Sequence, residues 1–330
     1  MTTIHVAVVI VTYRTAELTI DCLKSIEPER HGGNLRITAV VIDNSSEDAS
    51  AVKRSIDENG WASWASVACA PKNGGFAYGN NLGVRLSENC GIPDYIHLLN
   101  PDTVLRSGAI TSLVEFLETN LNVGIAGSSF ENLDGSDWPI AFRYPTMISE
   151  IEEGLQLGIA SRLLEPWIVA RTMTKSAQMV DWIPGASMMV RKSVFDAIGG
   201  LDEGYFLYFE ETDFCFRALK KGFPTWYVPA SRVMHIAGQS TKVTERSTTV
   251  KRMPGYWFES RRRFFLSSYG LRYSILTDVF AIFAGSLGAI KRVLLRQTSR
   301  SIPFFLSDLV RHSVLWPKNR KFTGLPSPSQ

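Results

Sequence analysis

Three segments that lie far apart in the sequence carry residue types that bind metal ions and move protons. Asp102 follows an apolar run, Glu210 and Glu211 open an acidic cluster, and His235 comes after a second apolar run. Carboxylate oxygens are preferred ligands of Mg²⁺ or Mn²⁺, and a neutral imidazole can complete the shell. A carboxylate within hydrogen-bond reach of a hydroxyl group can remove its proton. We therefore interpret Asp102 and His235 as metal ligands, and Glu211 or Glu210 as the general base of a group transfer.

Each of these residues also has an ordinary structural interpretation. An aspartate after a strand often forms a turn, and a single histidine is more often a hydrogen-bonded structural residue. Acidic residues at a helix start often act as caps, and we expect Asp213 to form an exposed pair with Arg217, four residues later. The order of the three segments along the chain favours the chemical interpretation.

Polar residues at predicted strand ends, and glycine-rich segments, indicate a nucleotide site. Strand ends in a parallel sheet face one crevice, where aromatic, hydroxyl and carboxylate groups can hold a nucleobase and its ribose. The candidate donor-binding residues are Thr12, Tyr13, Arg14, Asp43, Asn44, Gly75, Asn81 and Asn100. Plain turn formation is an equally good explanation for each of them alone. No GxGxxG or P-loop motif occurs, which counts against dehydrogenases and P-loop kinases.

The acceptor side has weaker signals. Trp182 is a candidate stacking surface for an acceptor sugar, although a core tryptophan explains it equally well, and Gly185 follows it. A weakly amphipathic stretch at 148–164 is expected to form a lid or an acceptor-side helix.

Alternating strand and helix patterns predict the fold that positions these residues. We expect strands at 5–12, 37–42, 67–70, 95–99, 123–127, 182–190 and 225–234. We expect helices after Thr15, through 82–86, at 108–119 and at 211–221. The alternation indicates an α/β fold with a doubly wound, mostly parallel sheet and right-handed crossovers.

Composition describes a globular protein without a disulfide framework. The 330 residues are 45% hydrophobic and 20% charged, which is typical of chains with a substantial core. Four scattered cysteines lack CxxC spacing, so reduced thiols in a cytoplasm are expected. The N-terminal residues lack the pattern of an export signal.

The last part of the chain has a different charge from the rest. Residues 251–330 contain 14 Lys and Arg against three acidic residues, a net charge of +11, whereas residues 1–250 carry −8. Asp278 interrupts the longest apolar run of this part, which is shorter than the ~20 residues of a spanning helix. We expect a basic, amphipathic helical extension at 251–330 that lies on an anionic membrane surface; packing on the body of the protein is an equal alternative. Large apolar residues between the charges count against nucleic acid.

The ordered motifs resemble the inverting glycosyltransferases of family 2, in particular their rhamnosyltransferase-like branch. The matching segments, in the family's order, are Val8–Arg14, Val41–Ser46, Asn73–Ala77, Leu98–Asp102, Gly185–Ser187, Phe209–Asp213 and His235. The resemblance implies a GT-A fold at 1–250 and a nucleoside-diphosphate sugar donor. It also implies Mg²⁺ or Mn²⁺ at the Asp-x-Asp-like element and Glu211 as the base.

Two positions depart from the family pattern. Asn100 replaces the first aspartate of the metal motif, and Glu211 stands where many relatives carry aspartate. The implied function is transfer of a sugar, with rhamnose as the first candidate, to a glycan or lipid-linked saccharide at the cytoplasmic face of a membrane. The alternatives are a sugar-nucleotide nucleotidyltransferase and a non-catalytic nucleotide-sugar-binding membrane scaffold. A nucleotidyltransferase should have a glycine-rich basic loop after its first strand, which residues 12–15 do not supply.

Overall fold

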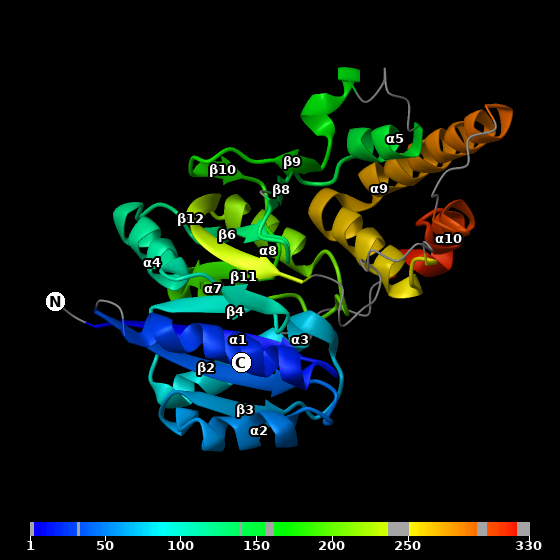
Figure 1. Cartoon of the computed structure of the whole chain (residues 1–330). Helices are drawn as coiled ribbons and strands as arrows, with labels where there is room; N and C mark the ends of the chain where they lie inside the picture. The colour runs from blue at the N-terminus through cyan, green and yellow to red at the C-terminus, as the bar shows by residue number, and fades with distance from the viewer. Residues whose placement is uncertain are drawn as a thin grey trace. The chain divides into compact units, whose positions relative to one another are not determined.

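The computed structural model describes residues 3–31, 34–138, 140–155, 162–236, 251–295 and 302–321, and Figure 1 shows its helices and strands. The chain forms two compact units. The sheet unit contains Met1–Ala141, Thr172–Glu203 and Glu210–Glu245, and the helical unit contains Phe142–Arg171, Gly204–Phe209 and Arg246–Gln330. The helical unit thus includes segments before residue 250 as well as the predicted extension. The predicted boundary at residue 250, between a catalytic domain and an extension, stays a prediction.

A ten-stranded sheet forms the centre of the sheet unit. Its strands are β1 (Ile4–Thr12), β2 (Leu35–Asp43), β3 (Ala65–Cys69), β4 (Tyr95–Leu99), β5 (Thr103–Leu105), β6 (Ile125–Glu131), β7 (Asp137–Trp138), β10 (Gln178–Val180), β11 (Ser187–Arg191) and β12 (Thr225–His235). The main order is β10-β12-β6-β11-β4-β1-β2-β3, with β5 beside β12 and β7 beside β6. Strands β3, β2, β1 and β4 run parallel to one another, and β6 runs parallel to β12. The predicted doubly wound sheet is therefore confirmed.

Helices cover both faces of this sheet, as its alternating side chains require. The helices are α1 (Ala16–Ile26), α2 (Ala49–Glu58), α3 (Gly75–Ser87), α4 (Ala109–Thr119), α7 (Lys192–Ile198) and α8 (Glu210–Lys220). Val41 packs in one core with residues of α1, α2 and α4, whereas Val40 and Ile42 pack on the other face with α3. Gly83 lets α3 approach the sheet, because a Cβ there would lie 2.3 Å from a methyl group of Val9.

Two predicted strand boundaries were wrong. The strand expected at 182–190 begins only at Ser187, because Pro184 and Gly185 belong to an irregular segment before it. The strand expected at 123–127 begins at Ile125 and continues to Glu131. Strand β11 is antiparallel to both β4 and β6, a direction that hydrophobic periodicity does not reveal.

The helical unit is built around a long, kinked helix. Its helices are α5 (Met147–Leu155), α9 (Gly255–Leu294) and α10 (Phe305–His312), and the short pair β8 (Ile140–Phe142) and β9 (Ala170–Thr172) lies at its boundary in the sequence. Helix α9 is interrupted at Gly270, where φ is 81° and ψ is 170°. Part of the predicted lid helix at 148–164 is α5, and residues 156–161 lie outside the described residues.

A buried ion-pair network holds the two halves of α9 together. Arg261, on the first half, donates to Glu150 of α5 at 2.8 Å and to Asp278, on the second half, at 2.7 Å. The other oxygen of Asp278 accepts the N–H of Val314 at 2.8 Å. Asp278, which interrupts the apolar run in the sequence, is therefore a buried structural residue.

The second half of α9 exposes a stripe of large apolar side chains. Its exposed members include Leu276, Val279, Phe280, Phe283, Leu287, Ile290 and Leu294. By length and composition α9 could cross a membrane: an 18-residue window has a mean hydropathy of 1.6, and 33% of that window is buried. Contact with a membrane surface stays a prediction.

Candidate active site

The carboxyl ends of β1, β2 and β4 bring several predicted site residues to one edge of the sheet. Thr12 lies opposite Asp43 in the β1–β2 register, and Leu99 lies opposite Ile10 in the β1–β4 register. After β3 the chain returns to the other side of β1, so the topological switch point lies between β1 and β4. Ligands of open α/β sheets bind at such a point. The expected common edge is therefore observed, while nucleotide contact stays a prediction.

Asp43 organises the loop that follows β2. Its two carboxylate oxygens accept five hydrogen bonds, from the N–H groups of Ser45, Ser46, Asp48 and Ala49 and from the Ser45 hydroxyl. Burial raises the pKa of Asp43, but these donors outweigh it and hold that pKa below its usual value. Asp43 is thus an anion that shapes the edge of the crevice.

Asp48 is a second loop carboxylate, which the sequence analysis did not select. It accepts the Thr12 hydroxyl at 2.5 Å and the N–H of Thr15 at 2.9 Å, and it is 4% exposed. The Thr12 hydroxyl is therefore already engaged with this carboxylate. A signal was available, because Asp48 follows a strand-ending aspartate within one predicted loop.

Tyr13 and Arg14 lie in the turn after β1. Arg14 has a φ of 57°, and its guanidinium group lies 5.4 Å from the centre of the Tyr13 ring. The side chain is 61% exposed and forms an ion pair with Glu47 at 2.7 Å. These contacts place one exposed cation beside the switch point, and its role toward a donor stays a prediction.

Asn44, Gly75 and Asn81 differ in how their groups are used. The Asn44 amide donates to the Gly75 carbonyl at 3.0 Å, and its buried Oδ1 has no partner among the described residues. Asn81 donates to the Leu201 carbonyl at 2.8 Å and to Glu203 at 3.0 Å, and accepts the Leu201 N–H. Asn81 therefore fastens the segment 201–203, whereas Asn44 keeps an unused acceptor. Donor contacts of all three stay predictions.

The two candidate metal ligands lie side by side. Nε2 of His235 is 3.4 Å from Oδ1 of Asp102, and both side chains are largely buried. Strand pairing causes this proximity, because His235 of β12 lies opposite Thr103 of β5. The N–H of Ile236 also donates to the Asp102 carbonyl at 3.0 Å.

This pair fits a divalent cation that takes its remaining ligands from substrate and water. Two atoms about 3 Å apart can be neighbouring ligands of one ion at ~2.1 Å. The His235 ring packs 5.4 Å from Phe130 and stacks on Trp138 at 6.3 Å, which fixes its orientation. Among the described residues, no group of three or more His, Cys, Asp or Glu side chains could hold a metal. Mg²⁺ often uses only one or two carboxylates together with substrate phosphates.

Glu210 and Glu211 begin α8 and share a buried environment. Burial and the charge of Glu211 raise the pKa of Glu210 well above its usual value, and burial raises the pKa of Glu211. Both Oε2 atoms are buried without a partner among the described residues. Two neighbouring carboxylates in such a place resist double ionisation. Asp213 does pair with Arg217, at 2.6 Å, but it is buried rather than exposed as expected.

A two-residue segment links Glu211 to the turn that carries Asp102. The Gly185 N–H donates to the Glu211 carboxylate, and the Ala186 carbonyl accepts the N–H of Asn100 at 3.0 Å. Gly185 must be small, because a Cβ there would lie 2.9 Å from the Phe76 ring. Gly185 and Ala186 thus connect the predicted base with the turn that carries the candidate metal ligand Asp102.

The half-buried Trp182 precedes this connection in the irregular segment. Its proposed stacking on an acceptor stays a prediction, as does an acceptor contact at Gly185.

A buried polar chain crosses the sheet beside the site and was not predicted. It runs from Nε2 of His97 on β4 to the hydroxyls of Ser187 (2.9 Å), Ser128 (2.7 Å) and Ser231 (2.7 Å). Burial lowers the pKa of His97 to about 3, so its ring is neutral. Ser231 belongs to a bulge of β12, between the paired residues Val228 and Arg232. The chain therefore supports the strand segment that leads to His235.

Comparison with known proteins identifies relatives of this chain. Residues 4–252 match the family described as "Glycosyltransferase like family 2". The chain is 28% identical over 220 residues to an N-acetylglucosaminyl-diphospho-decaprenol L-rhamnosyltransferase of Mycobacterium tuberculosis (strain ATCC 25618 / H37Rv). The alignment covers 62% of this chain and 68% of the relative. The chain is also 29% identical over 166 residues to the rhamnosyltransferase WbbL of Escherichia coli (strain K12), in an alignment that covers 49% and 61%.

Solved structures agree on the fold. A crystal structure of GalNAc-T7 with UDP, GalNAc and Mn²⁺ superposes with a TM-score of 0.58 at 14% identity, over 94% of this chain and 57% of the other. The mannosyltransferase PcManGT from Pyrobaculum calidifontis, with GDP-Man and Mn²⁺, gives 0.53 at 14% identity, over 96% and 81%. Both are GT-A glycosyltransferases, so the predicted fold class is confirmed. Since the family match spans most of the sequence, the chain belongs to glycosyltransferase family 2.

Proposed function

We propose that this glycosyltransferase moves a sugar, with rhamnose as the first candidate, from a nucleoside-diphosphate donor to a glycan or lipid-linked saccharide with inversion of configuration. One observation carries the proposal: the Gly185–Ala186 segment joins the Glu211 carboxylate to the Asn100–Asp102 turn. A base and a diphosphate-binding turn in one region are what a single displacement requires. The related rhamnosyltransferases support the choice of sugar.

Glu211 acts as the base in this mechanism. Its carboxylate accepts the proton of the acceptor hydroxyl as that oxygen attacks the anomeric carbon, and the bond to the diphosphate breaks on the opposite side. The raised pKa makes the ionised Glu211 a stronger base than an exposed glutamate. The Gly185 N–H orients the Glu211 carboxylate. The neighbouring Glu210, whose pKa is raised well above its usual value, keeps its proton when Glu211 ionises.

Asp102 and His235 are the residues that would hold Mg²⁺ or Mn²⁺. When bound there, such an ion neutralises charge that develops on the departing diphosphate. Asn100 precedes Asp102 by two residues, and its proposed role is to orient a phosphate oxygen or a water molecule. Thr12, Asp43 and Asn44 define the nucleoside side of the crevice.

The acceptor and the location are inferred from separate features. A relative acts on a diphospho-decaprenol saccharide, according to its name, which supports a lipid-linked acceptor here. The exposed apolar stripe of α9 and the net charge of +11 at 251–330 support contact with an anionic membrane surface. We propose a cytoplasmic enzyme that works at the inner face of the membrane.

Donor hydrolysis and transfer with the full chain test this function. The purified protein is incubated with dTDP-rhamnose or other nucleotide sugars and Mn²⁺, with and without a diphospholipid-linked N-acetylglucosamine acceptor. Asp102→Asn and Glu211→Gln should each lose most activity. Asp57→Asn and Glu58→Gln make the same chemical changes on the surface helix α2 and should keep it.

The rival functions predict other outcomes. A nucleotidyltransferase would form the nucleotide sugar from sugar phosphate and nucleoside triphosphate, and a scaffold would bind the donor without turnover. Unchanged hydrolysis and transfer in Asp102→Asn and Glu211→Gln would contradict the assigned site.

A further inference from the structure

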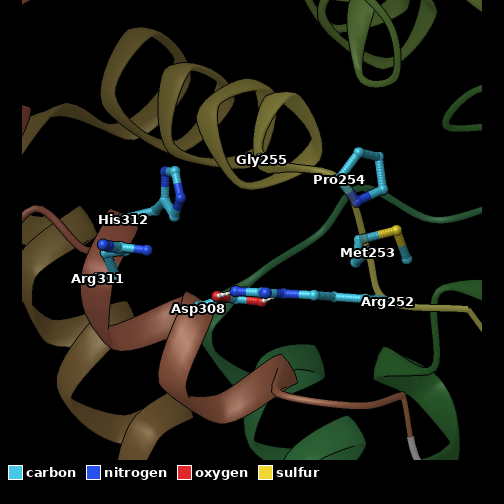
Figure 2. A pocket seen from close by; sticks show the side chains of 7 residues that line it. All are labelled: Arg252, Met253, Pro254, Gly255, Asp308, Arg311 and His312. Carbon is cyan, nitrogen blue, oxygen red and sulfur yellow. Dashed lines mark hydrogen bonds and ion pairs between the residues drawn. The ribbon is translucent and has the colours of Figure 1, made fainter.

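A hollow of about 350 Å³ lies between the start of α9 and α10, within the helical unit. Figure 2 shows Arg252 entering from one side and Arg311 and His312 of α10 lying on the other, with Asp308 between them. Its volume is at the lower end of the range of small-ligand pockets. Neither the family resemblance nor the proposed mechanism uses these residues.

The only carboxylate lining the described hollow is already neutralised. Arg252 donates to both oxygens of Asp308, at 2.8 and 2.6 Å, which is a bidentate ion pair. This hydrogen bonding with Arg252 lowers the pKa of Asp308. Because the Arg252 side chain remains 53% exposed, part of its guanidinium group is still available to a ligand.

Arg311 contributes a second positive charge, which also helps to lower the pKa of Asp308. The Arg311 side chain is exposed and has no hydrogen bond or ion pair within 302–321 or the other described ranges. The His312 ring stacks on Phe258 at 5.5 Å, and its Nδ1 atom is 4.0 Å from Glu259.

The surrounding charges leave the hollow with a positive excess. Arg262 of α9 donates to the His312 carbonyl at 3.0 Å. With Arg252 and Arg311 it outweighs Asp308 and Glu259 by one charge. Burial lowers the pKa of His312, so the neutral ring can donate one hydrogen bond at neutral pH.

We propose that this hollow binds a phosphate group through Arg311, Arg252 and His312. A phosphate ester offers oxygens that accept from several N–H donors at once, which suits guanidinium groups arranged around a small cavity. The phosphate belongs either to the headgroup of an anionic lipid or to a free phosphate compound. Exposed apolar neighbours favour the lipid: Phe304 is 67% exposed, and the Arg252 guanidinium lies 5.0 Å from its ring centre.

Two probes distinguish the sources. Inorganic phosphate is titrated into the full chain while NMR follows the ring of His312, with His312→Asn identifying the resonance among the five histidines. Sedimentation with phosphatidylcholine vesicles, with and without phosphatidylglycerol, measures lipid binding. Arg311→Gln removes one positive charge from the hollow, and Lys318→Gln removes an equal charge from the exposed segment after α10, outside the hollow. Donor hydrolysis serves as the folding control for both variants.

The wild-type ring should shift saturably with phosphate, and Arg311→Gln should weaken that binding about tenfold, whereas Lys318→Gln should not. Asp308→Asn should tighten binding, because it removes the carboxylate that neutralises Arg252. A selective loss of phosphatidylglycerol vesicle binding in Arg311→Gln identifies the lipid as the source. If Arg311→Gln weakens phosphate binding but leaves vesicle binding unchanged, the source is a free phosphate compound.

Two results would overturn the proposal. One is an absence of response to either probe in the wild-type chain. The other is an equal loss in Arg311→Gln and Lys318→Gln, since this would mean that only the overall positive charge matters. Neither result bears on sugar transfer, which donor hydrolysis and transfer test separately. A wild-type chain that binds no anionic vesicles would also remove the proposed membrane contact.

Discussion

Two clusters of buried carboxylates, one in each unit, differ in whether a cation neutralises them. In the helical unit, Glu150 and Asp278 both pair with Arg261, and their charges raise its pKa against the effect of burial. In the sheet unit, Glu210 and Glu211 share a buried place without a cationic partner among the described residues, and their pKa values are raised. Paired charges stabilise one conformation, whereas unpaired acids with raised pKa values can exchange protons. This difference distinguishes a structural network from a candidate catalytic one.

The largest expected effect is on catalysis. Glu211→Gln keeps the shape of the side chain but removes the base, so kcat should fall by about 10²–10⁴-fold. Thermal unfolding should show no loss of stability, since no ion pair is broken. A Tm drop comparable to that of an ion-pair variant would place Glu211 with the structural carboxylates instead.

Asp278→Asn should have the opposite signature. It leaves Arg261 buried with one carboxylate fewer, and breaking a buried pair costs about 3–5 kcal/mol in the free energy of unfolding. Urea denaturation measures this cost. Replacing Glu150, Arg261 and Asp278 together by Leu, Met and Leu should recover much of it, because no charge is then left buried. If the triple variant were less stable than the single one, simple charge neutralisation would not explain the network.

The pH dependence of stability in the Glu210→Gln variant tests whether this buried carboxyl group ionises. A carboxyl group with a raised pKa in the folded state contributes stability that is present at low pH and is lost as pH rises through that pKa. The variant should therefore gain stability over the wild type as pH increases, by about 1–3 kcal/mol. A stability difference that is independent of pH would exclude ionisation of Glu210 as the cause.

Ser231→Ala should have the smallest effect. It removes one neutral link of the polar chain from His97, and one such hydrogen bond contributes about 1 kcal/mol. Because Ser231 lies in the bulge that leads to His235, the variant should also need more Mn²⁺ for half-maximal activity. Ser66→Ala, at an exposed position of β3, is the matched control. Equal Mn²⁺ requirements in both variants would show that the bulge does not position His235.

Much of this architecture could be predicted, because local patterns determine it. The β-branched run at 5–12 became β1, the boundaries of β4 agree with the predicted 95–99, and the apolar spacing at 108–119 became α4. Strand β1 ends at Thr12 and β4 is followed by Asn100, and both residues were selected as candidates. Their meeting at one sheet edge follows from parallel pairing alone.

What could not be predicted depends on contacts between distant segments. The insertion of antiparallel β11 between β4 and β6 decides that Gly185 and Ala186 connect Glu211 with Asn100. The pairing of Asp278 with Arg261 requires the kink at Gly270, and no periodic pattern in the sequence predicts that kink. Such pairings depend on tertiary packing rather than on the composition of either segment.

The main-chain ladder between β5 and β12 builds the proposed metal site into the packing of the sheet. His235 of β12 lies opposite Thr103 of β5, next to Asp102, so strand register brings the two side chains to 3.4 Å before any nucleotide arrives. Because one of the two ligands is an imidazole nitrogen, such a site would suit Mn²⁺ better than Ca²⁺, which requires an oxygen-rich shell.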